Sequence, residues 1–409
     1  MHRRSVTLLA AIGFIAGCGG DASAPPVAAA ADLESPAGPN SGEPFLTSAG
    51  GAVYLSWLEA APAGGHDLRF SRWDGEAWGE PGVIAHRDDF FVNWADFPSI
   101  TAGADGTLWA HWLERGPNGG YDYGVRVVRS DDAGRRWSDP WTPHEDTSPT
   151  EHGFVATFPV DDGMGFVWLD GREHAQRPDG SEPTRDMTLR YRTLAVDGSP
   201  GAEMLVDGRV CDCCQTDAAV ATSGPVVVYR DRTEEEIRDI YITRFEDGAW
   251  TEGRPVHADG WKIPACPVNG PAVATRDDDV AVAWFSAPDD VPAVHVAFSA
   301  DGGRGFGPAI RVDDGQPAGR VDVMMLGDGA ALVSWLERTG GDRADVRLRR
   351  IGSDGAVSDA STLTGSSAER ASGFPRMISA PDGGVLVAWT DVADDEPRVR
   401  VRRLELGDR

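Results

Sequence analysis

Three of the five cysteines in this 409-residue chain lie within four positions, at Cys211, Cys213 and Cys214. A fourth, Cys266, follows 52 residues after Cys214. Cysteine sulfur and histidine nitrogen are the ligands that thiophilic ions such as copper and zinc prefer. His152 lies upstream of the cysteine run, so these five residues form a hypothetical Cys/His site for copper or zinc.

Disulfide bonding is the alternative for the same cysteines, because an exported chain meets an oxidising compartment. The adjacent Cys213 and Cys214 cannot easily pair with each other, and a bridge from Cys211 to Cys213 is strained by its short reach. A bridge between the run and Cys266 is favourable. The spacing matches no standard zinc motif, so metal binding, a redox role and structural bridging all stay open.

The first residues predict export. Arg3 and Arg4 precede a short apolar run, and Ile15-Ala16-Gly17-Cys18 closes it. This end resembles a bacterial lipobox. The resemblance implies a signal peptide over 1–17, a lipidated Cys18, a flexible Ala/Pro/Gly/Ser-rich tether over 18–42 and a folded part over 43–409. With Gly19 after the cysteine, the resemblance favours the outer membrane of the cell envelope.

The formal net charge of -27 repels phosphate backbones, so nucleic acid is not an expected partner. We expect a monomer that contacts the membrane only through its lipid, with a glycan or an envelope protein as possible partners.

An aromatic residue recurs inside an apolar segment seven times, at intervals of 51 to 61 residues. The seven are Trp57, Trp112, Trp168, Tyr229, Trp284, Trp335 and Trp389. Shorter apolar segments precede them and segments with period-two alternation follow, which is the pattern of strands. The sequence predicts an all-β fold, a single β-propeller of four-stranded antiparallel blades. We expect seven blades, with six as the alternative, and a segment near Val27 to Pro36 that completes the last blade.

Two turns match the pattern S-x-D-x-G-x-x-W/F, at 130–137 and 299–306. They resemble the Asp boxes (BNR repeats) of the sialidase superfamily. The whole chain, including Cys-Asp-Cys-Cys over 211–214, is similar to bacterial exported proteins described as sialidase-like on fold alone. The resemblance implies the propeller and not the chemistry.

Strand alternation places the loop before the first strand of each blade, here called the leading loop, on one face with the loops between second and third strands. The Asp boxes then lie on the opposite face. Candidate polar residues share the leading-loop face. The candidates for ligand binding are Asn93, Arg172, Arg230, Arg232 and Asn269, and those for catalysis are Asp96, Arg320, Asp322 and Arg370.

Sialidases hold a carboxylate with three arginines and use a Tyr-Glu nucleophile pair and an aspartate acid. By that resemblance, Arg320 and Arg370 suit a carboxylate clamp and Asp96 an acid. The chain departs from the family: Gly42 to Leu46 lacks the Phe/Tyr-Arg-Ile-Pro start, and the last tyrosine is Tyr241. Enzyme activity is uncertain, and an exo-acting glycoside hydrolase or glycan-binding propeller is the alternative to the Cys/His site.

Overall fold

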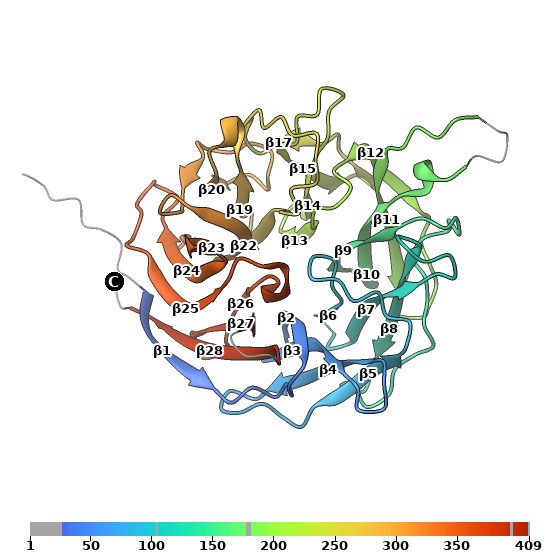
Figure 1. The fold of residues 1–409 in the computed structure, drawn as a ribbon, viewed down its shortest axis with the longest axis horizontal. Helices are drawn as coiled ribbons and strands as arrows, with labels where there is room; N and C mark the ends of the chain where they lie inside the picture. Colours follow the sequence, from blue (N-terminus) through green and yellow to red (C-terminus); the bar gives the residue numbers. More distant parts are fainter. Residues whose placement is uncertain (1–26, 104, 177–180, 393–395, 408–409) are drawn as a thin grey trace, which may run out of the picture.

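The computed structural model describes residues 27–103, 105–176, 181–392 and 396–407. The expected signal peptide and Cys18 lie outside these residues. The described part folds into seven antiparallel sheets arranged around a central axis (Figure 1). Within that part, no helix combines the length and hydrophobicity that a membrane span requires. The predicted seven-bladed all-β propeller is therefore confirmed.

Each blade begins with its innermost strand, and consecutive strands pair outwards. The first two blades are β2 (Ser41–Ala49), β3 (Ala52–Ala60), β4 (His66–Trp73) and β5 (Gly82–Arg87), then β6 (Ser99–Ala102), β7 (Leu108–Arg115) and β8 (Tyr123–Ser130). The third and fourth are β9 (His152–Val160), β10 (Gly163–Asp170), β11 (Met187–Ala195) and β12 (Met204–Val210), then β13 (Asp217–Ala221), β14 (Gly224–Arg230), β15 (Ile240–Glu246), β16 (Ala249–Trp250) and β17 (Arg254–Pro255).

The fifth and sixth blades are β18 (Ala272–Arg276), β19 (Asp279–Ser286), β20 (Ala293–Ser299) and β21 (Ile310–Arg311), then β22 (Pro317–Met325), β23 (Ala331–Gly340), β24 (Arg343–Ile351) and β25 (Ser361–Ser367). The seventh contains β26 (Arg376–Ser379), β27 (Val385–Asp391) and β28 (Arg398–Leu406). Three short 3-10 helices lie in connections: η1 (Arg172–His174), η2 (Pro288–Asp290) and η3 (Arg370–Ser372).

The N-terminal strand β1 (Val27–Leu33) closes the ring. It pairs antiparallel with β28, so the seventh sheet has the order β1-β28-β27-β26. Figure 1 shows the blue β1 beside the red β28. The expected closure by residues near Val27 to Pro36 is confirmed, and strands begin within the segment expected as a tether over 18–42. Closure removes an open sheet edge that would otherwise remain unpaired.

The recurring aromatic residues occupy the second strand of every blade and are at most 5% exposed. In three blades the buried indole donates to a carboxylate two residues further on, as from Trp57 to Glu59 at 3.0 Å and from Trp168 to Asp170 at 2.8 Å. Residues two apart in a strand share one face, so the same strand supplies both donor and acceptor. Every blade thus buries a large aromatic ring, and in these three the same strand also satisfies its polar atom.

The two Asp boxes follow the third strands β8 and β20, on the face opposite the leading loops. The Ser299 hydroxyl donates to Asp301 at 2.7 Å, and Asp301 accepts the Gly305 amide at 2.9 Å. Gly303 has a φ of 80°, a left-handed conformation that glycine adopts without strain. The predicted structural role of these turns is confirmed.

Three carboxylates in or just before inner strands connect neighbouring blades. Asp217 accepts the Val273 amide of the next blade at 2.8 Å, and Asp322 accepts the Met377 amide at 2.6 Å. Asp96 does the same with Phe154, at 2.7 Å. These bonds fix the leading loops relative to one another, and so fix the site that the loops form.

Candidate functional site

The cysteine run forms the leading loop of the fourth blade, and Cys266 lies in the leading loop of the fifth. Ligand atoms of Cys211, Cys213 and Cys214 all lie within 4.8 Å of one another. Cys266 is exposed, and its thiol interacts with that of Cys213. We call these four residues the cysteine cluster. The structure thus brings together all four cysteines predicted for the site.

The cluster has a buried half and an outer half. Cys211 and Cys214 are 1% and 2% exposed, and their sulfur atoms lie 3.2 Å apart. Cys213 is half-buried and connects this pair to the exposed Cys266. The described cysteines are all free thiols, and the 3.2 Å separation exceeds a covalent sulfur–sulfur bond of about 2.05 Å.

Positive charge surrounds the buried half. Arg238 Nη1 donates to the Cys211 sulfur at 3.3 Å. Hydrogen bonds from the Cys213 and Cys214 thiols hold the pKa of Cys211 well below its usual range, and the charge of Arg230 acts in the same direction. Burial raises the pKa of Cys214, and the hydrogen bond to Cys211 raises that of Cys213. Cys211 is therefore the thiol of the cluster whose ionised form its neighbours favour most.

Two arginines beside the cluster share one carboxylate. Glu236 accepts hydrogen bonds from Arg232 and from Arg238, both at 2.8 Å. Asp212, between the first two cysteines of the run, lies 3.5 Å from Arg232 and 3.8 Å from Arg238. Arg238 is a site residue that sequence reasoning missed. The only clue to it in the sequence was its position just after the Glu234–Glu236 run, in a loop on this face.

His152 belongs to a different group from the cysteines. Its Nε2 lies 3.0 Å from Asp146 and 3.8 Å from Asp170, and its ring stacks on His144 at 4.1 Å. Its Nδ1 faces the carbonyl oxygens of Thr150 and Tyr123 at 3.2 and 3.4 Å. Both ring nitrogens therefore face oxygen atoms and not the cysteine sulfurs, and His152 forms with Asp146 and Asp170 a separate group that could hold a metal ion.

Four of the predicted ligand-binding residues hold the protein's own structure. Arg230 is 1% exposed and donates to the carbonyl oxygens of Asn269, Arg238 and Phe285. Asn269 in turn accepts the Arg320 amide at 2.8 Å. Arg172 binds Asp170 and Glu203, each at 2.7 Å, and the Asn93 side chain accepts the Ala95 amide within a turn. Arg232 lies beside the cysteine cluster through Asp212, and the charge of the buried Arg230 acts on Cys211.

The proposed carboxylate clamp is divided between a buried and an exposed arginine. Arg320 is 5% exposed, and its guanidinium donates to Ser372 and to the carbonyl oxygens of Gly373, Ala368 and Glu369. It also lies over the Trp94 ring at 4.8 Å. Arg370 is exposed and lies 6.0 Å from the same ring.

The two carboxylates predicted for catalysis, Asp96 and Asp322, are buried and accept hydrogen bonds from the protein itself. Asp322 accepts backbone amides with both oxygens, and burial raises its pKa to about 6. Asp96 accepts the Tyr123 hydroxyl at 2.8 Å, and burial raises its pKa to about 7. Glu151 is close by, and burial followed by the charges of Asp96, Asp212 and Cys266 raises its pKa to about 8. Burial therefore favours the protonated form of these three carboxyl groups.

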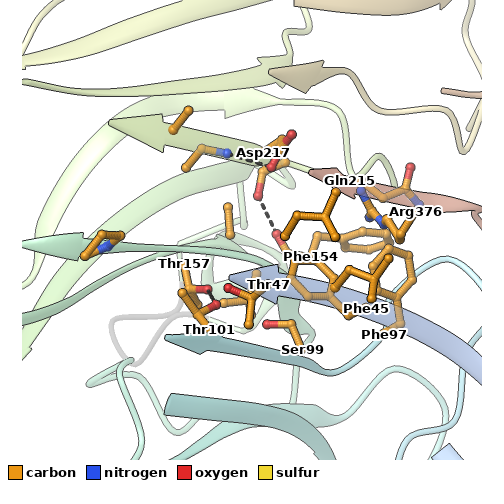
Figure 2. Close-up of a pocket in the computed structure, with 18 of the residues that line it drawn as sticks. Phe45, Thr47, Phe97, Ser99, Thr101, Phe154, Thr157, Gln215, Asp217 and Arg376 are labelled. Atoms are coloured by element: carbon orange, nitrogen blue, oxygen red, sulfur yellow. Dashed lines mark hydrogen bonds between the residues drawn. The ribbon is translucent and has the colours of Figure 1, made fainter. Parts of the chain in front are cut away.

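The inner strands enclose an axial cavity of about 670 Å³. Figure 2 shows Arg376, Phe45 and Phe97 together at one side, and Thr47, Thr101 and Thr157 at another. The Arg376 guanidinium lies over both phenylalanine rings, at 5.3 and 4.9 Å. Hydroxyl, aromatic and guanidinium groups together suit a small polar ligand.

Gln215 separates this cavity from the cysteine cluster. Its Nε2 donates to the Ala95 carbonyl at 2.6 Å, and its Oε1 accepts the Gly270 amide at 2.9 Å. These bonds join the leading loops of blades two, four and five at the end of the cavity nearest the cysteines. Lining residues at the other end, such as Ser48 and Val220, are exposed. The cavity therefore opens towards the Asp-box face.

Comparisons with known proteins find the fold and no family. No protein-family model matches the chain, and no curated protein is similar to it in sequence. A protein of unknown function from Dyadobacter fermentans is 15% identical, with 93% of this chain and 99% of that chain covered at a TM-score of 0.52. The polysaccharide lyase Uly1 is 11% identical over 88% of this chain and 89% of its own, with a TM-score of 0.51. The NanB sialidase of Streptococcus pneumoniae is 12% identical over 89% and 68%, with a TM-score of 0.42. At these identities the similarity concerns the propeller fold alone.

Proposed function

We propose that this propeller binds a thiophilic metal ion, copper or zinc, through the cysteine cluster. The observation that carries the proposal is the meeting of four free thiols from two loops, three of them within 4.8 Å. Sulfur atoms bound to one tetrahedral zinc ion at about 2.3 Å lie about 3.8 Å apart. The sulfurs of Cys211 and Cys214 are 3.2 Å apart, and all three sulfurs of the run lie within 4.8 Å of one another, so small side-chain movements bring them around an ion.

The arginines favour this role because they offset the charge of bound thiolates. Thiols lose their protons to a metal ion, and a buried group of thiolates requires nearby positive charge. Arg238 already donates to Cys211, and Arg230 and Arg232 lie beside the run. Two structural disulfides carry no charge and would not require nearby arginines.

Elemental analysis tests the proposal when it is combined with a count of free thiols under denaturing, metal-free conditions. Protein purified from its native envelope should carry about one copper or zinc ion and four free thiols. Cys211→Ser and Cys214→Ser should lose the metal. Cys18→Ser is the matched cysteine control and should keep it. Absence of both metal and free thiols would show two disulfides and overturn the metal site.

The same experiment separates a redox role from metal binding. The sulfur atoms of Cys211 and Cys214 are 3.2 Å apart, close enough to form a bond after a small movement. A reversible change in the free-thiol count from four to two, without bound metal, would favour a redox role for the cluster.

A second candidate function is glycan binding or exo-acting hydrolysis in the axial cavity, favoured by the hydroxyl and aromatic lining and by Arg376. We expect no turnover of a fluorogenic sialoside above background. Tyr123, the tyrosine beside Asp96, is 2% exposed, and burial raises its pKa well above the usual range, so it is a poor nucleophile. Turnover that is lost in Asp96→Asn or Arg376→Gln would favour the hydrolase instead.

We further propose that the protein lies in the bacterial envelope, attached to the outer membrane by a lipid on Cys18 and otherwise monomeric. The lipobox-like residues Ile15 to Cys18 support the lipid.

A further inference from the structure

We propose a second metal position beside the cysteine cluster, formed by His174 Nε2 and Asp212 Oδ1, which takes a divalent ion such as zinc. This inference rests on the proposed function, because it concerns the same site. It would make the site a centre for two ions, with a sulfur-rich position and a neighbouring position of nitrogen and oxygen ligands.

The two ligand atoms are buried and make no hydrogen bond. Among the described residues, neither His174 Nε2 nor Asp212 Oδ1 has a hydrogen-bond partner, although both are inaccessible to solvent. They lie 3.9 Å apart. Asp212 Oδ1 also lies 3.5 Å from Arg232 Nη1, in an ion pair that an ion at this position would have to share. Buried polar atoms in folded proteins nearly always have a partner. Two such atoms facing each other indicate that something is bound between them.

The separation is too long for a direct hydrogen bond and close to that of two ligands on one ion. Zinc binds imidazole nitrogen and carboxylate oxygen at about 2.0–2.2 Å in tetrahedral geometry, so two such ligand atoms lie about 3.4 Å apart, and a small side-chain movement from 3.9 Å would bring both to an ion. Where this chain pairs histidine with aspartate directly, the distances are shorter. His257 and Asp259 are 2.8 Å apart, and His86 and Asp67 are 2.7 Å apart.

The backbone holds both residues in place. His174 ends the 3-10 helix η1, whose Arg172 is bound to Asp170 and Glu203. Asp212 lies between Cys211 and Cys213 in the leading loop of the fourth blade, and its charge acts on Cys266. In this proposal the exposed Cys266 would supply a further ligand and make a site of mixed sulfur, nitrogen and oxygen ligands.

The charge of the surroundings allows a second cation. Four thiolates, Asp212 and Glu236 carry six negative charges, against three positive charges on Arg230, Arg232 and Arg238. One divalent ion in the cysteine cluster still leaves a net negative charge. The guanidinium of Arg232 donates hydrogen bonds of 2.8 to 3.2 Å to Glu236. Its positive charge is therefore shared between Glu236 and Asp212.

Zinc stoichiometry tests the inference. Full-length protein purified in detergent is loaded with zinc chloride, freed of excess ion by desalting and measured by elemental analysis. Wild type should hold two zinc ions per chain. His174→Ala, His174→Gln and Asp212→Asn should each hold one. His257→Ala removes an exposed histidine of another His–Asp pair and should hold two.

Cobalt substitution shows whether the cysteine position survives in these variants. His174→Ala loaded with cobalt should keep the thiolate charge-transfer band and bind one ion fewer than wild type, with an unchanged thermal midpoint in the metal-free state. One zinc ion in wild type that persists in His174→Ala would overturn the second position and leave the proposed function intact. Loss of all metal in His174→Ala would show a single centre and also overturn it. No zinc in wild type would overturn the second position, and absence of both zinc and copper would overturn the proposed function as well.

Discussion

The guanidinium of Arg320 lies 4.8 Å from the ring of Trp94, across the leading-loop end of the propeller axis. Trp94 belongs to the leading loop of the second blade, and Arg320 to the first strand of the sixth. Trp94 also stacks on Phe374 at 5.8 Å. These contacts join blades two, six and seven. Arg320, which the sequence suggested as part of a substrate clamp, therefore stabilises the packing of these blades.

The first prediction compares the two arginines of that expected clamp. Arg320→Ala should lower the free energy of unfolding by about 3–5 kcal/mol, because it leaves several buried acceptors without a donor. The exposed Arg370→Ala should change it by less than about 0.5 kcal/mol. Denaturant titrations measure both. Equal, small effects would contradict the structural role of Arg320.

The second prediction concerns Gln215. Gln215→Ala removes two hydrogen bonds that join three blades and should lower the free energy of unfolding by about 1–3 kcal/mol. The exposed Gln316→Ala is the matched control and should be neutral. If Gln215 seals the cavity, its loss should also make the cysteine cluster react faster with a bulky thiol reagent. An unchanged reaction rate would contradict the barrier.

The third prediction is a pH dependence of stability. Burial raises the pKa of Asp96 from 3.8 to about 7, so the folded state binds a proton that the unfolded state releases. The resulting stabilisation is fully present below pH 4 and is lost as pH rises through 7. The free energy of unfolding of wild type should therefore fall between pH 4 and pH 8. Asp96→Asn should reduce this fall by an amount on the order of 2 kcal/mol.

Thermal unfolding of wild type and Asp96→Asn between pH 4 and pH 8 measures this difference in pH dependence. Asp131→Asn, at an exposed position in the first Asp box, should leave the wild-type slope unchanged. The buried Glu151, with a pKa of about 8, should keep part of the slope in Asp96→Asn. A slope of the opposite sign in wild type would contradict the burial of these carboxyl groups in their protonated form.

The fourth prediction concerns closure of the ring. A chain that begins at Ser35 lacks β1 and leaves the edge of β28 unpaired. Its melting temperature should fall by about 5 °C or more, and size-exclusion chromatography should show association through the open edge. A chain that begins at Pro26 keeps β1 and should behave as the longer protein. Identical melting of both chains would show that β1 adds nothing to stability.

The fifth prediction concerns the membrane anchor. Mature wild-type protein should partition into the detergent phase and begin at Cys18, and Cys18→Ser should move it to the aqueous phase. Phase partitioning and N-terminal mass analysis check this. A mature wild-type chain in the aqueous phase that begins at another residue would rule out the lipid.

The sequence by itself determined the repeated fold. Seven aromatic residues at a regular interval, with period-two strands around them, require seven equivalent sheets, because each ring needs the same buried place. Strand alternation then put Cys211 and Cys266 on one face. Pairing of β1 with β28 was expected for the same reason, since the last repeat lacks a strand.

Only the tertiary structure decided which side chains meet. His152 and Cys211 lie in neighbouring leading loops, yet the histidine binds Asp146, which follows the third strand of the preceding blade. Arg320 shares its face with the cysteines but donates to the blade beside it. Sequence spacing fixes the face of a propeller on which a residue lies. The direction of its side chain depends on partners from other blades, which are distant in sequence.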